Sequence, residues 1–410
     1  MLKNYIKTAV RNIIRNKIFS TINIAGLSIG ILSSILITLY VIDELSYDSF
    51  FSNADRIYRL AYETEASVGQ RNHYPSIGGG VGEQLKIDFP EIVSVVRIFK
   101  NTAGGTTWLV KDNERFREDN FFFADSSLFD VLDYEFLKGN PDNAFRVPNS
   151  LVITEAIEKK YFGSEDSINR TLGFELPNGT LIDLKVTGVL KDLPDNTHFH
   201  FDFLFPMSSV GNLFPGAPPR AIQNFLSNWQ FTAFYTYFLA PENFDAELFE
   251  EKLPAFLNNH TTTRQREFIK GIYTQKLTDI HLRSNYLLNE IEPNSDIMYV
   301  YIFAVIAVMT IIVACINFMN LSTAKSANRV KEVGLRKVSG ADRPDIIRQF
   351  LGESSLIAFI ALIIAIIIVT ISLPAFNGIS GKEFDLGFLG DPVLITGLVV
   401  MTLFVGVLAG

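Results

Sequence analysis

The sequence has 410 residues, of which 48% are hydrophobic, and it carries a net charge of −8 and a single cysteine. One cysteine excludes an internal disulfide, and no cysteine pattern suggests a zinc or iron–sulfur centre. Residues 43–296 hold 23 basic and 37 acidic residues, a net charge of −14 that argues against a nucleic-acid partner.

Residues 1–17 predict an amphipathic helix that lies on a membrane surface. One helical face is apolar, and the other carries a cation every four residues, at Lys3, Lys7, Arg11 and Arg15. Such a helix places its cations beside anionic headgroups, so membrane lipids are an expected partner. Because the segment carries five basic residues, the positive-inside rule puts the N-terminus in the cytosol.

Residues 18–42 predict the first membrane span. These 25 residues carry no charge and would extend about 37 Å as a helix, more than the roughly 30 Å of a hydrocarbon core. The run is too long for a signal peptide and offers no small-residue cleavage site, so a retained helix is expected. Gly26 and Gly30 have a small-xxx-small spacing that favours close helix packing, although membrane helices also simply tolerate glycine.

Residues 43–296 predict a mixed α/β domain on the external side. Short runs rich in apolar residues predict strands at 57–62, 92–98, 150–153, 182–190 and 232–240. Helices are expected at 80–88, at 244–258, and from a Thr154 cap to Gly163. The run Pro177-Asn178-Gly179 predicts a turn between two strands. Residues 208–229 have the weakest pattern and are interpreted as a mobile or inserted loop.

Three further spans are expected, at 297–324, 351–376 and 392–410, with a short external loop at 377–391. Residues 325–350 carry seven basic and three acidic residues, so this segment is placed in the cytosol. Gly334 and Gly340 are expected to interrupt it, and Asp342 to cap a restarted helix. Since the fourth span reaches Gly410 without a basic flank, we expect a truncated span in a longer protein.

The basic segment 325–350 is the main candidate for a functional site. A short polar helix at the cytosolic end of membrane helices can be displaced by a cytosolic partner. Glu332 lies among cations and gives the segment a specific pattern. We therefore favour partner docking over the alternative that these charges only fix the topology.

Two glycine-rich runs do not match a nucleotide-binding motif. Residues 378–383 have the wrong spacing for a P-loop and end in Glu. Residues 78–82 lack a Lys-Ser/Thr pair and a preceding buried strand, and they are interpreted as a flexible entrance to a helix. No P-loop is present in the sequence, and the chain is not expected to be an enzyme.

The remaining polar residues are interpreted as structural. His198 and His200 could supply half a metal site, but a solvated strand face is the favoured interpretation. Asp279 and His281 lack the motif of a hydrolase. No ionisable residue is expected within any span, which argues against a secondary transporter. No catalytic, metal or cofactor-binding residue is assigned, and no cofactor is expected.

The junction around the basic segment resembles the FtsX/MacB-like ABC transporter permeases. The similar runs there are Ala314 to Ala324, Lys331 to Lys337, Gly340-Ala341 and Gln349 to Ser354. Residues 43–296 resemble the MacB-type periplasmic core domain. The similar runs in that part are Ala54 to Arg59, Val152 to Thr154, Tyr161 to Gly163, Val186 to Val189 and Leu277 to Leu282.

The resemblance implies an α-helical membrane protein with four transmembrane helices and a large mixed α/β domain between the first two. It implies the bacterial inner membrane, with residues 43–296 in the periplasm. The expected partners are a cytosolic ABC ATPase subunit, a second permease half (the same chain continued or a second copy), and a periplasmic adaptor or outer-membrane protein. The positions implied for ATPase coupling are Arg329, Lys331, Glu332, Val333, Gly334, Leu335, Arg336, Lys337, Gly340 and Ala341.

The function implied by the resemblance is that of a permease subunit in an ABC-type mechanotransmission or efflux complex. Such a subunit couples ATP hydrolysis by a separate ATPase to a conformational change in the periplasmic domain. The alternative is a regulatory membrane subunit that relays the state of the ATPase to an external enzyme, such as a cell-wall hydrolase, without transport.

Overall fold

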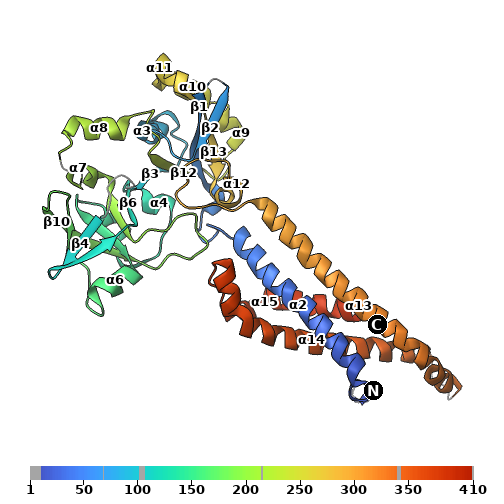
Figure 1. Ribbon diagram of the computed structural model, residues 1–410. Helices are drawn as coiled ribbons and strands as arrows, with labels where there is room; N and C mark the ends of the chain where they lie inside the picture. The colour runs from blue at the N-terminus through green and yellow to red at the C-terminus, as the bar shows by residue number, and fades with distance from the viewer. Residues whose placement is uncertain (1–10, 68, 101–106, 214–215, 339–342, 409–410) are drawn as a thin grey trace. The chain divides into compact units, whose positions relative to one another are not determined.

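The computed structural model describes residues 11–67, 69–100, 107–213, 216–338 and 343–408, with the backbone alone for some of these, chiefly 325–338. The chain divides into two compact units (Figure 1). We call residues 44–297 the globular unit, and residues 1–43 together with 298–410 the helical unit.

The globular unit is built on one mixed sheet with the strand order β13-β1-β12-β3-β6-β11-β8-β10-β9-β4-β5. In addition, β2 pairs with β1, and β7 pairs with β10. The strands are β1 Ile57–Ser67, β2 Gln70–Tyr74, β3 Ser94–Lys100, β4 Thr107–Lys111, β5 Glu114–Glu118, β6 Phe121–Ala124, β7 Phe136–Gly139, β8 Ser150–Thr154, β9 Thr171–Glu175, β10 Leu181–Leu190, β11 Phe203–Pro206, β12 Phe234–Leu239 and β13 Ile269–Lys276.

Short helices accompany the sheet. The α-helices are α3 Gly79–Asp88, α4 Leu128–Val131, α5 Pro141–Ala144, α6 Glu155–Phe162, α7 Val210–Leu213, α8 Pro219–Ser227, α9 Ala246–Glu250, α10 Leu253–His260, α11 Thr263–Phe268 and α12 Ile280–Arg283. The 3-10 helices are η1 Ala54–Arg56, η2 Met207–Ser209 and η3 Leu277–Asp279.

Strand β12 shows how the core of the globular unit is organised. All six of its residues are buried. Tyr235, Tyr237 and Leu239 join one apolar cluster, whereas Phe234 and Phe238, with the opposite parity, join two others. Because side chains alternate between the faces of a sheet, β12 is covered on both sides and holds the clusters together.

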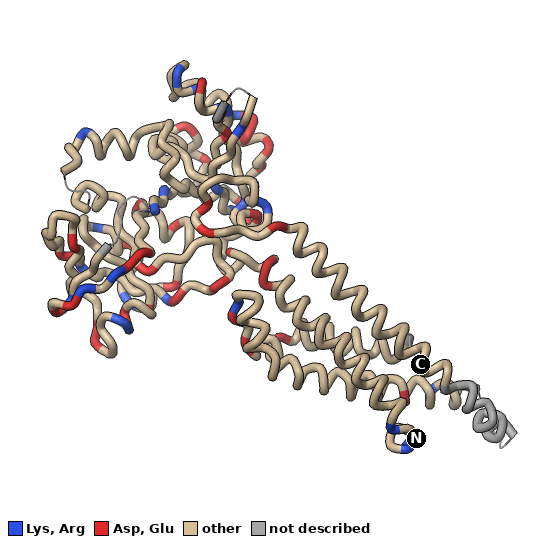
Figure 2. Tube along the Cα trace, in the orientation of Figure 1, with Lys and Arg blue, Asp and Glu red and all other residues tan. Residues whose placement is uncertain are grey.

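The helical unit contains α2 Lys17–Leu45, α13 Ile297–Val338, α14 Arg343–Ser380, η4 Leu386–Gly390 and α15 Pro392–Leu408. The first three helices contain apolar stretches long enough to cross a membrane, namely Lys17–Leu45, Ile297–Ala324 and Ile346–Ser380, and α15 carries a shorter apolar stretch, Pro392–Val407. Figure 2 shows that charged residues are sparse along these helices and frequent on the globular unit. The chain is therefore a multi-pass membrane protein with a large mixed α/β domain after its first helix.

Most elements predicted for the globular unit are confirmed. Strands β1, β3, β8, β10 and β12 and helices α3 and α6 cover the expected positions. Thr154 occupies the N-cap of α6 without a capping hydrogen bond from its side chain. Gly179 has φ +79° in the turn between β9 and β10, which glycine adopts without strain. The helix expected at 244–258 is divided into α9 and α10, and Pro254 lies in the first turn of α10.

The interpretation of residues 208–229 as a mobile or inserted loop is wrong. This segment contains η2, α7 and α8, and Ile222, Phe225 and Leu226 of α8 pack against the apolar cluster around Phe234. Their i, i+3, i+4 spacing is that of an amphipathic helix, so the signal was present in the sequence.

The interpretation of residues 78–82 as a flexible entrance to α3 is also wrong, because Gly79 to Gly82 are buried residues of α3 itself. A Cβ atom on Gly79 would lie 2.2 Å from the carbonyl oxygen of Leu226, and one on Gly80 would lie 2.4 Å from that of Ser227. The glycines therefore allow the start of α3 to approach the backbone at the end of α8, where no side chain fits.

Candidate functional site

The candidate coupling residues lie at the end of a single long helix. Residues 329–337 belong to the last turns of α13, which is continuous for 42 residues. Their side chains, and the whole of Gly340, Ala341 and the expected Asp342 cap, lie outside the described residues. At about 1.5 Å per residue α13 is roughly 63 Å long, about twice the thickness of a hydrocarbon core. One helix thus connects the last residue of the globular unit, Ile297, to the basic segment.

The interruption expected at Gly334 does not occur, because α13 continues to Val338. A glycine inside a helix costs about 1 kcal/mol relative to alanine. Leu335, Arg336 and Lys337 have high helix propensities, so the helix tolerates a single glycine before them. The described part of the basic segment is therefore a direct extension of the second span.

Helix α2 packs against α13 through a stripe of small residues. A Cβ on Gly30 would meet the Cβ of Ala314 at 2.6 Å, and a Cβ on Gly26 would meet Asn317 Nδ2 at 3.3 Å. One turn further, the Ser34 hydroxyl donates a hydrogen bond to the carbonyl oxygen of Ala307 at 3.1 Å. Residue numbers fall along α13 as they rise along α2, so the two helices are antiparallel.

The opposite face of α2 contacts α14. The Ser28 hydroxyl donates to the carbonyl oxygen of Ala361 at 3.1 Å. Ala358, Ala361 and Ala365 are fully buried on one face of α14 and join the same apolar cluster as Leu27 of α2. Small side chains on α14 therefore allow α2 to pack closely between α13 and α14.

The expectation that no ionisable residue lies in a span is wrong for the third one. The apolar stretch Ile346–Ser380 of α14 includes Arg348 and Glu353. Glu353 is buried, and its Oε2 accepts a hydrogen bond from Asn12 Nδ2 at 3.3 Å. A buried carboxylate needs such a donor, and here the donor comes from the helical residues 11–15 that precede α2.

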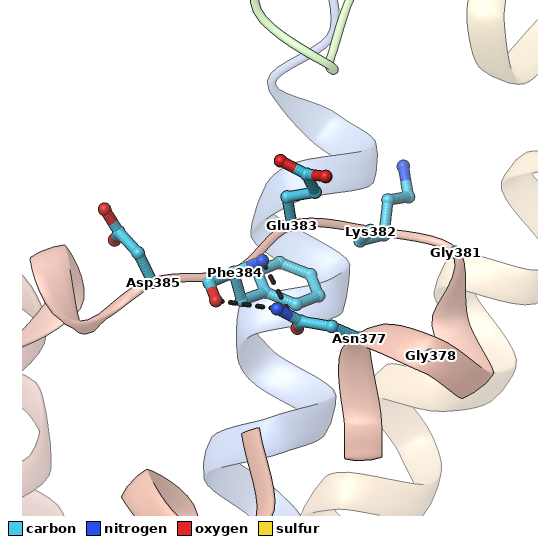
Figure 3. Close-up of a pocket in the computed structure, with 7 residues that line it drawn as sticks. All are labelled: Asn377, Gly378, Gly381, Lys382, Glu383, Phe384 and Asp385. Carbon is cyan, nitrogen blue, oxygen red and sulfur yellow. Dashed lines mark hydrogen bonds between the residues drawn. The ribbon is translucent and has the colours of Figure 1, made fainter. Parts of the chain in front are cut away.

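The loop between α14 and α15 is held in place by Asn377 (Figure 3). The side-chain amide of Asn377 donates to the carbonyl oxygen of Phe384 at 2.8 Å and accepts from the Phe384 amide at 3.3 Å. The loop encloses an open hollow of about 600 Å³. Lys382 in this loop pairs with Asp43 near the end of α2, at 2.6 Å.

The segment that follows α2 is fastened to the core of the globular unit by Asp48. Its Oδ1 lies 2.9 Å from His198 Nδ1 and accepts a hydrogen bond from the Thr197 hydroxyl at 2.8 Å. On its other side, His198 Nε2 lies 2.7 Å from the hydroxyl of Tyr237. Asp48 and His198 are both buried, so this segment is tied to strand β12 in the centre of the sheet.

The segment that precedes α13 is fastened by two further ion pairs. Arg59, fully buried on β1, binds both carboxylate oxygens of Glu290 at 2.8 and 2.7 Å. Burial alone lowers the pKa of Arg59, but the charge and hydrogen bond of Glu290 outweigh it and raise the pKa above its ordinary value. His200 Nδ1 lies 3.0 Å from Glu292 Oε2.

The interpretation of His198 and His200 as a solvated strand face is wrong, because residues 198–200 form no strand and each imidazole pairs with a different carboxylate. Within the described residues no group of three or more His, Cys, Asp or Glu side chains could hold a metal ion. Asp279 pairs with Arg283, whereas His281 pairs with Glu44. No local pattern indicates the roles of Asp48 and Glu290, because their partners lie 150 and 231 residues away in the sequence.

Known families match both units of the chain. The description "MacB-like periplasmic core domain" matches residues 20–256, and "FtsX-like permease C-terminal" matches residues 304–410. The macrolide export ATP-binding/permease protein MacB of Aggregatibacter actinomycetemcomitans is 22% identical over 367 residues, which are 86% of this chain and 50% of that protein. The protein of the same name from Campylobacter jejuni is 36% identical over 107 residues, or 26% of this chain and 16% of that protein. The chain spans half or less of the length of these relatives.

Solved structures similar to this chain include a domain of a protein described as a permease from Porphyromonas gingivalis. It has 18% sequence identity and a TM-score of 0.47, over 62% of this chain and 98% of that one. The periplasmic region of MacB from Actinobacillus actinomycetemcomitans has 15% identity and a TM-score of 0.37, over 55% of this chain and 91% of that one.

Proposed function

The chain belongs to the FtsX/MacB-like family of ABC transporter permeases, and from this premise we propose that it is a mechanotransmission subunit. ATP hydrolysis by a separate cytosolic ATPase subunit moves the membrane helices, and these change the conformation of the globular unit. The substrate does not have to cross the bilayer between the helices of this subunit. Its role is export, or extrusion from the periplasm.

The observation that carries this proposal is the continuity of α13. The helix begins at the last residue of the globular unit and extends 14 residues beyond the apolar stretch that ends at Ala324. A helix resists bending and compression more than a loop does, because every backbone hydrogen bond lies along its axis. A displacement of residues 329–337 therefore reaches Ile297 without a flexible linker between them.

Because α2 packs on α13, a displacement of α13 also moves α2. Both helices that continue into the globular unit are then involved. Gly30 and Ser34 bring the two backbones together in a medium where packing and polar bonds, rather than the hydrophobic effect, hold helices to each other. We propose that Gly26 and Gly30 are packing positions and that α2 and α13 move as a pair.

The proposed orientation puts the N-terminus and residues 325–350 in the cytosol of a bacterial inner membrane and the globular unit in the periplasm. It is supported by the basic residues of both cytosolic segments. At the same end of the helical unit, Arg15, Lys17, Phe19 and Leu321 help to line an open hollow of about 500 Å³. A loop of the ATPase subunit could insert there beside the end of the α13 span.

The direct test is charge reversal in the candidate coupling residues. We expect the double variant Arg336→Glu, Lys337→Glu to insert in the membrane and to lose its co-purifying ATPase, because the acidic pair repels the surface that the basic pair binds. The measurement is the molar ratio of ATPase to permease after gentle purification from native membranes.

The matched control is the double variant Lys3→Glu, Lys7→Glu, which reverses the same number of cytosolic charges outside the coupling segment. It is expected to retain the ATPase. Equal retention by both variants would contradict the assignment of residues 329–337. A stable external enzyme that co-purifies with the chain, together with unchanged efflux on deletion, would favour the regulatory alternative.

A further inference from the structure

His281 binds both segments through which the globular unit continues into membrane helices. Its Nε2 lies 3.1 Å from Oε2 of Glu44, and Glu44 belongs to the last turn of α2. Its main-chain carbonyl oxygen accepts a hydrogen bond from the amide of Ser295 at 3.0 Å. Ser295 lies two residues before α13 begins. The end of the first helix and the approach to the second are thus fixed to one residue.

The surroundings of His281 make this link firm. His281 and Glu44 are 6% and 2% exposed, so little water competes for the bond between them. The ring of Tyr47 stacks on the imidazole with ring planes 4° apart. Ile280, the neighbouring residue in α12, is fully buried in the apolar cluster that contains Tyr237 of the sheet. A displacement of Glu44 therefore acts on the apolar core of the globular unit and not on a mobile loop.

The residue before Glu44 makes the corresponding link within the helical unit. Asp43 pairs with Lys382 of the α14–α15 loop at 2.6 Å. Two consecutive carboxylates at the end of α2 therefore belong to one unit each: Asp43 pairs with Lys382 within the helical unit, and Glu44 pairs with His281 within the globular unit.

We infer that His281 is the positioning residue through which α2 and α13 act together on the globular unit. This inference rests on the proposed function. When α2 and α13 shift, the bonds of His281 keep Glu44 and Ser295 in a constant position relative to each other. The whole sheet therefore rearranges. Without these bonds, the segments that connect the helices to the globular unit change conformation instead, and the displacement does not reach the sheet.

The experiment uses the full chain assembled with its ATPase in lipid nanodiscs. Cys315 is replaced by serine, and spin labels are attached at Lys159→Cys on α6 and Arg264→Cys on α11. Both residues are exposed, and α6 contacts β8 and β10, whereas α11 contacts β1 and β13. The distance between the labels with and without ATP therefore reports movement between two distant parts of the sheet.

We expect Glu44→Ala and His281→Ala to abolish the ATP-driven distance change, and His281→Gln to restore most of it because its amide can still donate to Glu44. The matched control is His260→Ala, which removes a histidine–carboxylate pair of 2.7 Å with Asp88 that involves neither connecting segment. This variant is expected to move like the wild type. Thermal unfolding of each variant separates loss of coupling from loss of folding.

Glu44→Ala decides the outcome if His281→Ala does not fold. A folded Glu44→Ala variant with the wild-type distance change would overturn the inference and leave the proposed function standing. If the wild-type complex hydrolyses ATP with no distance change, the proposed function itself fails, and the inference fails with it.

Discussion

The two units of this protein use polar residues in opposite ways. In the globular unit, the buried side chains of Arg59 and Asp48 pair with Glu290 and His198, which lie far away in the sequence. In the helical unit, the contacts depend on small residues and on hydroxyls that donate to main-chain carbonyls, as at Gly30 and Ser34. The surrounding medium explains the difference. A water-exposed domain has a hydrophobic core for stability and can use ion pairs to fix positions, whereas membrane helices associate through close packing.

The largest expected effect concerns the charge pair that fastens the segment before α13. Glu290→Gln leaves the fully buried guanidinium of Arg59 without its carboxylate, so we expect the globular unit to lose about 3–5 kcal/mol of unfolding free energy. Urea unfolding followed by tryptophan fluorescence measures this loss, since Trp108 and Trp229 both lie in that unit.

The control for this prediction is Glu135→Gln, which breaks an exposed pair with Lys191 at 2.9 Å. Its expected cost is much smaller, because water and salt screen an exposed ion pair. If Glu290→Gln and Glu135→Gln lose the same unfolding free energy, burial does not distinguish the two ion pairs. The contrast drawn for the globular unit would then fail.

A smaller effect is expected from filling the contact between α2 and α13. Gly30→Leu places a side chain where even a Cβ would meet Ala314 at 2.6 Å, so the helices must separate, at a cost of about 1–3 kcal/mol. Thermal unfolding in detergent measures the loss. Gly397→Leu on α15, where a Cβ meets nothing within 4 Å, should leave the stability unchanged. A Gly30→Leu variant as stable as Gly397→Leu would contradict close packing at this position.

The smallest expected effect is the pH dependence of the His200–Glu292 pair. The hydrogen bond to Glu292 raises the pKa of His200 above 6.5, so this stabilisation is complete below pH 6.5 and is lost as the pH rises through the raised value. Burial alone raises the pKa of Glu292, but the bonds to His200 outweigh it and lower the pKa below 4.5. The carboxylate therefore stabilises the fold above pH 4.5, and this contribution is lost as the pH falls through the lowered value.

The melting temperature of the wild type should exceed that of His200→Gln most clearly between about pH 4.5 and 6.5, and the difference should shrink above that range. Melting curves from pH 4 to pH 9 measure it. A difference that stays constant with pH would mean that the pair contributes packing alone.

The same contrast explains which features the sequence could reveal. Apolar spans, short apolar runs and the Gly179 turn are local patterns, and they predicted α2, α13 and five of the thirteen strands. The small-residue spacing at Gly26 and Gly30 is local as well. By contrast, the pairs Arg59–Glu290 and Asp48–His198 depend on the tertiary fold, which brings distant residues together and leaves no periodic signal. The interruption expected at Gly334 is wrong because the helix propensity of the neighbouring residues outweighs the tendency of one glycine to end a helix.

The most direct test of the central claim is to interrupt α13 between its span and the coupling residues. Three glycines inserted after Ala324 would make the junction flexible, and the distance between the labels at positions 159 and 264 would be measured with and without ATP in the assembled complex. The same insertion after Gly179, in the β9–β10 turn, is the control. The account predicts that ATP hydrolysis continues after the Ala324 insertion while the distance change disappears, and that the control moves normally. A full distance change with the interrupted α13 would contradict transmission through this helix.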